Sequence, residues 1–261
     1  MKQFLLVTAI ICAVLQAPVL RAQDGAVPRA ADSSVAAQPL RPDGSRLQPR
    51  AMLYDVLVTG DSGTQHVGWY TVWIYDVTFA GRPAWEVSDR RESHAPFAVR
   101  VTRDSVILGR DDLAPLRWEA SAAASRFVTA FSGDSAYGGA TGPAARSTFT
   151  IAAPAPIVTS EGSLDALLQI APLGAGWSAS ASMLVADMAG ARLLPLHLAV
   201  VREEAVAIPS GQFEAWVVRA AANGSERLIW IDKATRVVVK TSEVPPHMPG
   251  TTVERILVGG R

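Results

Sequence analysis

The chain of 261 residues contains one cysteine, Cys12, which lies in an apolar N-terminal segment. Ile11 precedes it, whereas a lipoprotein signal has a small residue at that place, so we expect no lipid attachment there. If the segment is removed on export, the mature protein has no cysteine at all. Disulfides, thiol nucleophiles and cysteine-ligated metals are then excluded together.

An excess of charge of either sign is also missing. The sequence has 24 basic and 24 acidic residues, and loss of Lys2 and Arg21 with the N-terminal segment leaves 22 against 24. Proteins that bind nucleic acid or an anionic membrane surface usually carry a basic patch. The balance therefore argues against both kinds of partner.

Motifs for cofactors and catalysis are absent as well. No Gly-x-Gly-x-x-Gly follows a strand and no Gly-x-x-x-x-Gly-Lys occurs, which disfavours nucleotide cofactors. The histidines, His66, His94, His197 and His247, are scattered without a metal-binding spacing. We predict a protein without cofactor, metal or catalytic residues, which is not an enzyme.

Long hydrophobic runs are confined to the N-terminus. Residues 1–22 combine Lys2, an interrupted apolar run to Leu20 and the small residue Ala22, which is typical of a secretory signal peptide. The run is too short and too broken for a membrane-spanning helix. We predict export to the periplasm or the extracellular space, with association to the envelope as an option, and no integral membrane segment after cleavage.

Residues 23–49 are rich in Ala, Pro, Ser, Asp and Gly and contain no aromatic residue, so they are predicted to be a flexible leader. Residues 50–261 are long enough for one sizeable core, and they contain no second linker of this composition. We therefore expect a single β-rich domain over 50–261.

Alternating and β-branched patterns dominate this domain and indicate strands. They lie at 51–59, 66–79, 82–92, 97–102, 105–109, 115–119, 125–131, 178–186, 192–207, 213–221, 226–232, 236–242 and 251–258. Between them, 163–170 has the pattern of a short helix, for which Ser163 is the expected N-cap and Asp165 a favourable first-turn residue. The fold class expected is mainly β: a strongly curved antiparallel sheet, a half-barrel or open barrel, with one or two short helices.

The string Gly60-Asp61-Ser62-Gly63 also surrounds the nucleophilic serine of trypsin-like proteases. In those enzymes the histidine and aspartate precede the serine, but no histidine precedes Ser62 here. Gly, Asp and Ser favour tight turns, and the string separates two strand patterns. We predict a hairpin turn, and a second one at Asn223-Gly224.

The stretch from Glu204 to Val218 carries a Pro209-Ser210-Gly211 turn before an aromatic strand, and Trp230-Ile231-Asp232 returns after it. This order resembles a family of exported bacterial proteins of unknown function, over about Tyr54 to Val258. Those proteins distantly resemble the periplasmic lipoprotein carriers (LolA/LolB-like half-barrels). The resemblance implies an open half-barrel around an apolar cavity.

Several aromatic side chains lie in strand patterns from which they could line such a cavity, although ordinary core packing is an alternative for each. The candidate ligand-binding residues are Trp69, Trp73, Tyr75, Trp216 and Trp230. The function expected is non-enzymatic binding of an apolar ligand, a lipid or a lipidated protein, in the concavity of the sheet. The alternatives are an envelope scaffold or assembly module that binds a protein partner, and a hydrolase with an unrecognised catalytic constellation.

Overall fold

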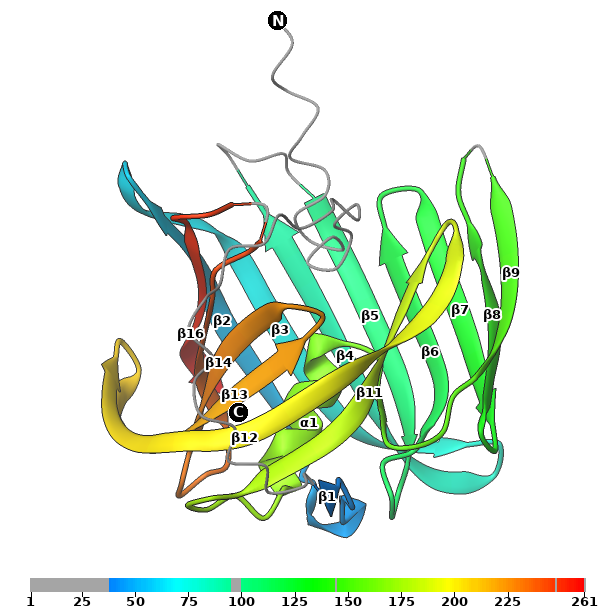
Figure 1. Ribbon diagram of the computed structural model, residues 1–261, viewed down its shortest axis with the longest axis horizontal. Coiled ribbons are helices and arrows are strands. Elements are labelled where there is room, and N and C mark those ends of the chain that lie inside the picture. The colour runs from blue at the N-terminus through cyan, green and yellow to red at the C-terminus, as the bar shows by residue number, and fades with distance from the viewer. Residues whose placement is uncertain (1–37, 95–99, 144, 247, 261) are drawn as a thin grey trace, which may run out of the picture.

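The computed structural model describes residues 38–94, 100–143, 145–246 and 248–260 (Figure 1). The predicted signal peptide and the first part of the predicted leader lie outside the described residues. In the described part, sixteen strands form one sheet, accompanied by one α-helix and one 3-10 turn. The predicted fold class, a curved and mainly antiparallel β-sheet with one or two short helices, is confirmed.

The element bounds are β1 (Gln38–Pro39), η2 (Gly44–Arg46), β2 (Arg50–Gly60), β3 (Gly63–Phe79), β4 (Arg82–Ser93), β5 (Arg100–Gly109), β6 (Pro115–Ala122), β7 (Ser125–Ser132), β8 (Ser135–Thr141), β9 (Arg146–Ala152), β10 (Ile157–Val158), α1 (Glu161–Ile170), β11 (Ser178–Asp187), β12 (Gly190–Ile208), β13 (Gly211–Ala222), β14 (Ser225–Asp232), β15 (Val238–Glu243) and β16 (Thr252–Gly260).

The sheet consists of two antiparallel meanders. Strands β2 to β9 form the N-terminal meander and β11 to β16 the C-terminal one, each with neighbours in chain order. The last strand, β16, pairs antiparallel with β2 and joins the two meanders. The hydrogen-bonded order ends at β9 on one side and at β11 with its short parallel partners β1 and β10 on the other, so the sheet is not closed.

Tight turns connect neighbouring strands within the two meanders. The turn at Asp61-Ser62 joins β2 and β3, and the predicted hairpin at Gly60-Asp61-Ser62-Gly63 is confirmed. The second predicted hairpin joins β13 and β14, where both Asn223 (φ 47°) and Gly224 (φ 77°) adopt left-handed backbone. Asn and Gly tolerate this conformation better than other residues, which is why this pair marks the turn.

Part of the predicted leader is folded. Residues 38–49 contain β1 and η2, and Leu40 and Leu47 are buried in the hydrophobic core. The indole Nε1 of Trp85 donates a hydrogen bond of 3.0 Å to the carbonyl oxygen of Gly44. These contacts order a segment whose composition alone suggests a flexible chain.

The two faces of β3 have different environments. Tyr70, Val72 and Ile74 are buried in the core. Trp69 and Tyr75, on the alternate face, are 43% and 45% exposed. Both faces of β3 are apolar in the sequence, but only one of them is buried in the fold.

Helix α1 lies in the concavity between the two meanders (Figure 1). It begins at Glu161, two residues before the predicted start, because the N-cap is Ser160 and not the predicted Ser163, which instead completes a reciprocal capping box. Every residue from Gly162 to Ile170 is buried. Ala166 and Ile170 pack on the core cluster that the N-terminal meander dominates, whereas its leucines pack on the C-terminal meander.

Within the described ranges, the structure contains no helix with the length and apolar character needed to cross a membrane.

Candidate functional site

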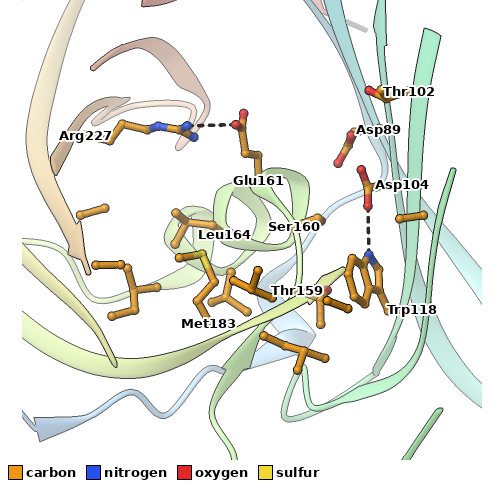
Figure 2. Close-up of a pocket in the computed structure, with 18 of the residues that line it drawn as sticks. Asp89, Thr102, Asp104, Trp118, Thr159, Ser160, Glu161, Leu164, Met183 and Arg227 are labelled. Carbon is orange, nitrogen blue, oxygen red and sulfur yellow. Dashed lines mark hydrogen bonds and ion pairs between the residues drawn. The ribbon is translucent and has the colours of Figure 1, made fainter. Parts of the chain in front are cut away.

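A cavity of about 230 Å³ remains in the concavity at the N-terminal end of α1 (Figure 2). Its walls come from β4 to β7 on one side, from β11 to β15 on the other, and from the segment that leads into the helix. Most of the lining is apolar, with Trp118, Phe127, Leu164 and Met183 as the larger side chains. Charged groups line it on β4 and β5, in the first turn of α1 and on β14 and β15, so the cavity is amphipathic.

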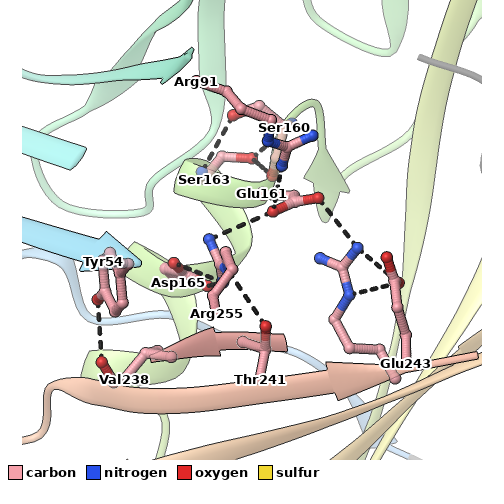
Figure 3. Close-up of polar contacts among 11 residues, drawn as sticks. Tyr54, Arg91, Ser160, Glu161, Ser163, Asp165, Val238, Thr241, Glu243 and Arg255 are labelled. Atoms are coloured by element: carbon pink, nitrogen blue, oxygen red, sulfur yellow. Dashed lines mark hydrogen bonds and ion pairs between the residues drawn. The ribbon is translucent and has the colours of Figure 1, made fainter. Parts of the chain in front are cut away.

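The charged groups begin with a network around Glu161 (Figure 3). Its carboxylate pairs with Arg91 of β4 and Arg227 of β14, each at 2.9 Å, and with Arg255 of β16 at 3.2 Å. Arg255 also contacts Asp165 one helical turn later, at 3.2 Å. These ion pairs attach the helix to both meanders.

Further contacts satisfy the same arginines. Arg227 pairs with Glu243 at 2.7 Å, and the Nε of Arg255 donates to Thr241 at 3.2 Å. The Arg255 guanidinium lies 4.4 Å from the centre of the Tyr70 ring, a cation–π distance. Each guanidinium of the network therefore already has an acidic partner within the protein, which for Arg91 is the shared Glu161.

A second pair of acids, Asp89 and Asp104, lacks such partners. The two residues face each other across β4 and β5, and their carboxyl groups lie beside the cavity (Figure 2). Asp104 accepts a hydrogen bond of 3.0 Å from the Nε1 of Trp118. Asp89 is only 6% exposed, and in the described part of the chain no donor or cation pairs with its carboxylate.

The helix approaches this pair closely. A Cβ atom at Gly162 would lie 2.9 Å from Oδ2 of Asp89 and 3.2 Å from Cγ1 of Val87. Glycine at the second helical position therefore allows this close approach, and a larger side chain there would displace the Asp89 carboxyl group or move α1 away from β4. The hydroxyl of Thr159, just before the helix, lines the same cavity and is buried without a partner.

Burial changes the protonation of both acids, and at Asp89 repulsion from Asp104 adds to it. Burial raises the pKa of Asp104 to about 6. Burial, and then the neighbouring Asp104 charge, raises the pKa of Asp89 well above its usual range. For Glu161 burial acts in the same direction, but Arg227, Arg91 and Arg255 outweigh it and hold its pKa well below the usual value.

The five predicted ligand-binding aromatics do not meet at this cavity, since none is among the described residues that line it. The side chains of Trp69 and Tyr75 are largely exposed, and Trp73 lines a groove on the other face of β4 and β5. Trp216 packs against the C-terminal core beneath the Arg236 guanidinium. Trp230 is 6% exposed in the core, consistent with the core-packing alternative.

The groove beside Trp73 has a volume of about 430 Å³. Its charged residues largely pair with one another or with neighbours, such as Arg126 with Glu119 and Arg90 with Glu92. It is larger than the interior cavity and shares Asp89 and Asp104 with it, and the Nε of Arg90 in its wall is buried without a partner. Apart from Trp73 and Ala120, however, the residues that line it are polar or charged, so it offers little apolar wall for a ligand chain. We therefore take the interior cavity as the stronger candidate.

Two of the histidines lie together at the surface. His66 is 3.1 Å from Asp55 through Nε2 and 3.3 Å from His94 through Nδ1, and the two imidazole rings flank Trp69. His66 therefore lies between an acid and a second histidine, not between an acid and a serine. Over the described ranges, no group of three or more potential ligands is arranged to hold a metal ion.

Three comparisons place the chain among known proteins. The model of the family DUF3108, described as a protein of unknown function, matches residues 54–245. No curated protein matches the chain.

Among solved structures, a β-barrel-like protein of the domain of unknown function DUF1849 from Brucella abortus has a TM-score of 0.55 at 11% identity. The alignment covers 82% of this chain and 98% of that one. A Bacteroides fragilis protein with a YmcC-like fold, described as a candidate exported protein, has a TM-score of 0.35 at 8% identity and covers 86% and 98%. The first likeness supports the fold; neither identifies a ligand.

Proposed function

This chain belongs to the DUF3108 family of proteins of unknown function, and we propose that it is an exported, non-enzymatic protein that binds a small amphiphile in the cavity beside α1. The single observation that carries the proposal is the amphipathic cavity of about 230 Å³ with an unpartnered, buried carboxyl group in its wall. A core built only for stability would leave neither the space nor the free polar group.

The size of the cavity limits the ligand. Pockets that enclose whole drug-sized molecules measure roughly 300–1,000 Å³, and this cavity is smaller. Helix α1 occupies the part of the concavity that an empty half-barrel would offer. The proposed ligand is therefore a single short acyl or alkyl chain, or the end of a longer one, such as part of a lipid or lipidated chain.

The chain of the ligand would contact the apolar wall, and its polar end would lie toward β4 and β5. Burial of each methylene contributes about 0.8 kcal/mol. Shortening the chain by two methylenes should then weaken binding by roughly tenfold. The sequence resemblance to lipoprotein carriers is in keeping with this class of ligand.

Isothermal titration calorimetry with octanol and hexanol tests the proposal. Ala220→Phe places a ring in the cavity from β13, because Ala220 is buried and lines it. Ala221→Phe, on the alternate face of the same strand, is the matched control. We expect octanol to bind the wild-type protein and the control about tenfold more tightly than hexanol does, and the Ala220 variant to lose binding.

Absence of octanol binding to the wild-type protein, or equal binding to the two variants when both retain the wild-type circular dichroism spectrum, would refute the cavity as the ligand site.

A second candidate function, binding of a protein partner in the envelope, is favoured by the exposed aromatic face of β3. Trp69 and Tyr75 are nearly half exposed, and Leu53 of the neighbouring β2 is 39% exposed. Exposed aromatic residues are frequent at protein interfaces. If this candidate holds, cross-links from β3 to one defined envelope protein will disappear in a Trp69→Ser, Tyr75→Ser variant and persist in the Ala220→Phe variant.

A further inference from the structure

The charges around the cavity are not balanced. Five buried or half-buried carboxyl groups, those of Asp89, Asp104, Glu161, Asp165 and Glu243, face three guanidinium groups, those of Arg91, Arg227 and Arg255. The ion pairs described above join all three arginines to Glu161, Asp165 and Glu243. Asp89 and Asp104, which line the cavity side by side, form no ion pair in the described part of the chain, and the nearby Arg91 charge lowers the pKa of each less than burial raises it.

An unpaired carboxylate in such a place is costly, because desolvation opposes its charge and the neighbouring acid repels it. The pair can lower this cost by keeping a proton or by accepting a cation. A positively charged group placed between the two carboxyls would act as the missing fourth cation of the cluster. Such a group would form charge-assisted hydrogen bonds with oxygens that no residue of the described chain fills at Asp89.

We propose that the cavity selects ligands with a cationic amine head, which Asp89 and Asp104 bind while the attached chain lies against the apolar wall. This inference rests on the proposed function and specifies the head group of its ligand. An ammonium group offers three donors. Asp89 and Asp104 provide carboxylate acceptors for them, and the free hydroxyl of Thr159 is a further acceptor on the cavity wall.

The same arrangement disfavours anionic amphiphiles. A fatty-acid carboxylate in this position would face Asp89 and Asp104, and it could reach Arg91 or Arg227 only by displacing Glu161 or Glu243 from their ion pairs. Removal of an arginine from a buried acid leaves an uncompensated charge. The cavity should therefore rank ligands of equal chain length in the order amine, alcohol, carboxylate.

Octylamine and octanoate below their micellar concentrations, and octanol below its solubility limit, test this ranking by calorimetry at pH 7.5 on the wild-type protein. We expect octylamine to bind at least tenfold more tightly than octanol, and octanoate to bind more weakly than octanol. The double variant Asp89→Asn, Asp104→Asn should bind octylamine and octanol with similar affinity. Asp61→Asn, in the exposed β2–β3 turn, should preserve the wild-type ranking.

The outcomes separate this inference from the proposed function. Binding of octanol without any preference for octylamine would overturn the amine selectivity and leave the amphiphile site in place. Binding of none of the three probes would overturn both. Because the ranking is measured on the wild-type protein, the inference stands or falls even if the double variant does not fold.

Discussion

Replacement of Asp104 by asparagine is expected to stabilise the protein at pH 7.5 and to leave its stability unchanged near pH 3. The pKa of Asp104 rises from an ordinary 3.8 to about 6 on folding, mainly because the carboxyl group is buried. The folded state therefore disfavours the charged form. Stability is fully retained while the group is protonated in both states, and it falls as pH rises from about 4 to about 6.

The magnitude follows from the size of the shift. A difference of about two pKa units corresponds to about 3 kcal/mol at pH values above 6, which is an upper limit because Asp104 is not completely buried. Asparagine keeps the acceptor for the Trp118 indole and removes the charge. It also relieves the repulsion that raises the pKa of Asp89.

Urea unfolding at several pH values between 3 and 8 measures this effect as the difference between the Asp104→Asn variant and the wild-type protein. Glu161 and Asp165 titrate in both proteins, so their contributions largely cancel in the difference. Asp61→Asn, at an exposed turn, should show no such pH-dependent gain. A variant that is no more stable than the wild-type protein at pH 7.5 would refute the account of a buried, uncompensated carboxyl pair.

Other substitutions test the packing of α1. Glu161→Gln should lower the free energy of unfolding by about 3–5 kcal/mol in urea titrations, because it leaves three arginines without their shared acid. Tyr54→Phe removes the buried hydrogen bond to the carbonyl oxygen of Val238 and should cost about 1–3 kcal/mol, measured in the same way. Gly162→Ala should cost about 1–3 kcal/mol, because its Cβ crowds Asp89 and Val87 and either these side chains or the helix must shift. Free energies of unfolding equal to the wild-type value in these variants would contradict the role of the helix contacts.

The affinity for octylamine is expected to fall as pH drops below about 6. Protonation of Asp104 removes the negative charge that holds the amine, whereas octanol binding should change little. The groups that face this pair are Arg91 on β4, Glu161 on α1 and Arg255 on β16. Calorimetry at pH 5 and 7.5 checks the difference; an affinity for octylamine that stays constant would contradict the proposed contact.

Local sequence signals were sufficient for the hairpins. Gly60-Asp61-Ser62-Gly63 and Asn223-Gly224 carry the turn chemistry of two-residue hairpins, and both turns lie where they were predicted. The Pro209-Ser210 turn between β12 and β13 is of the same kind. Strands β8 and β9 were not predicted. In β8, Gly138 and Gly139 interrupt the β-branched pattern on which the prediction depends, whereas β9 carries such a pattern and was missed.

The candidate site could not be predicted in this way, because its partners are far apart in the chain. Arg255 lies 90 positions from Asp165, and Arg227 lies 66 positions from Glu161. Asp165 looked like a first-turn acid that favours a helix N-terminus, yet its side chain is buried against Arg255. One local signal was present in β4. Asp89 and Arg91 follow the buried Val87 at every second position, so the strand pattern places these charged side chains on the same inward face.

The tryptophans were predicted to line the cavity because they are large and aromatic. The alternation of side chains along a strand does not tell which of its two faces lies on the concave side of the sheet. Trp69 and Trp73 share one face of β3, and in the fold that face is the outer one. What fills the concavity could not be predicted either, because it is a helix whose contacts with the sheet join residues far apart in the chain. The helix that fills much of it is recognisable from the sequence, but its position relative to the sheet depends on the ion pairs of Glu161 and on apolar contacts with both meanders.

The most direct test of the central claim is a crystal structure of the protein grown with octylamine. The account predicts one alkyl chain between Leu164 of α1 and Ala220 of β13, with its nitrogen within hydrogen-bond distance of Asp89 and Asp104. An empty interior cavity, or a chain bound only at the outer groove beside Trp73, would contradict it.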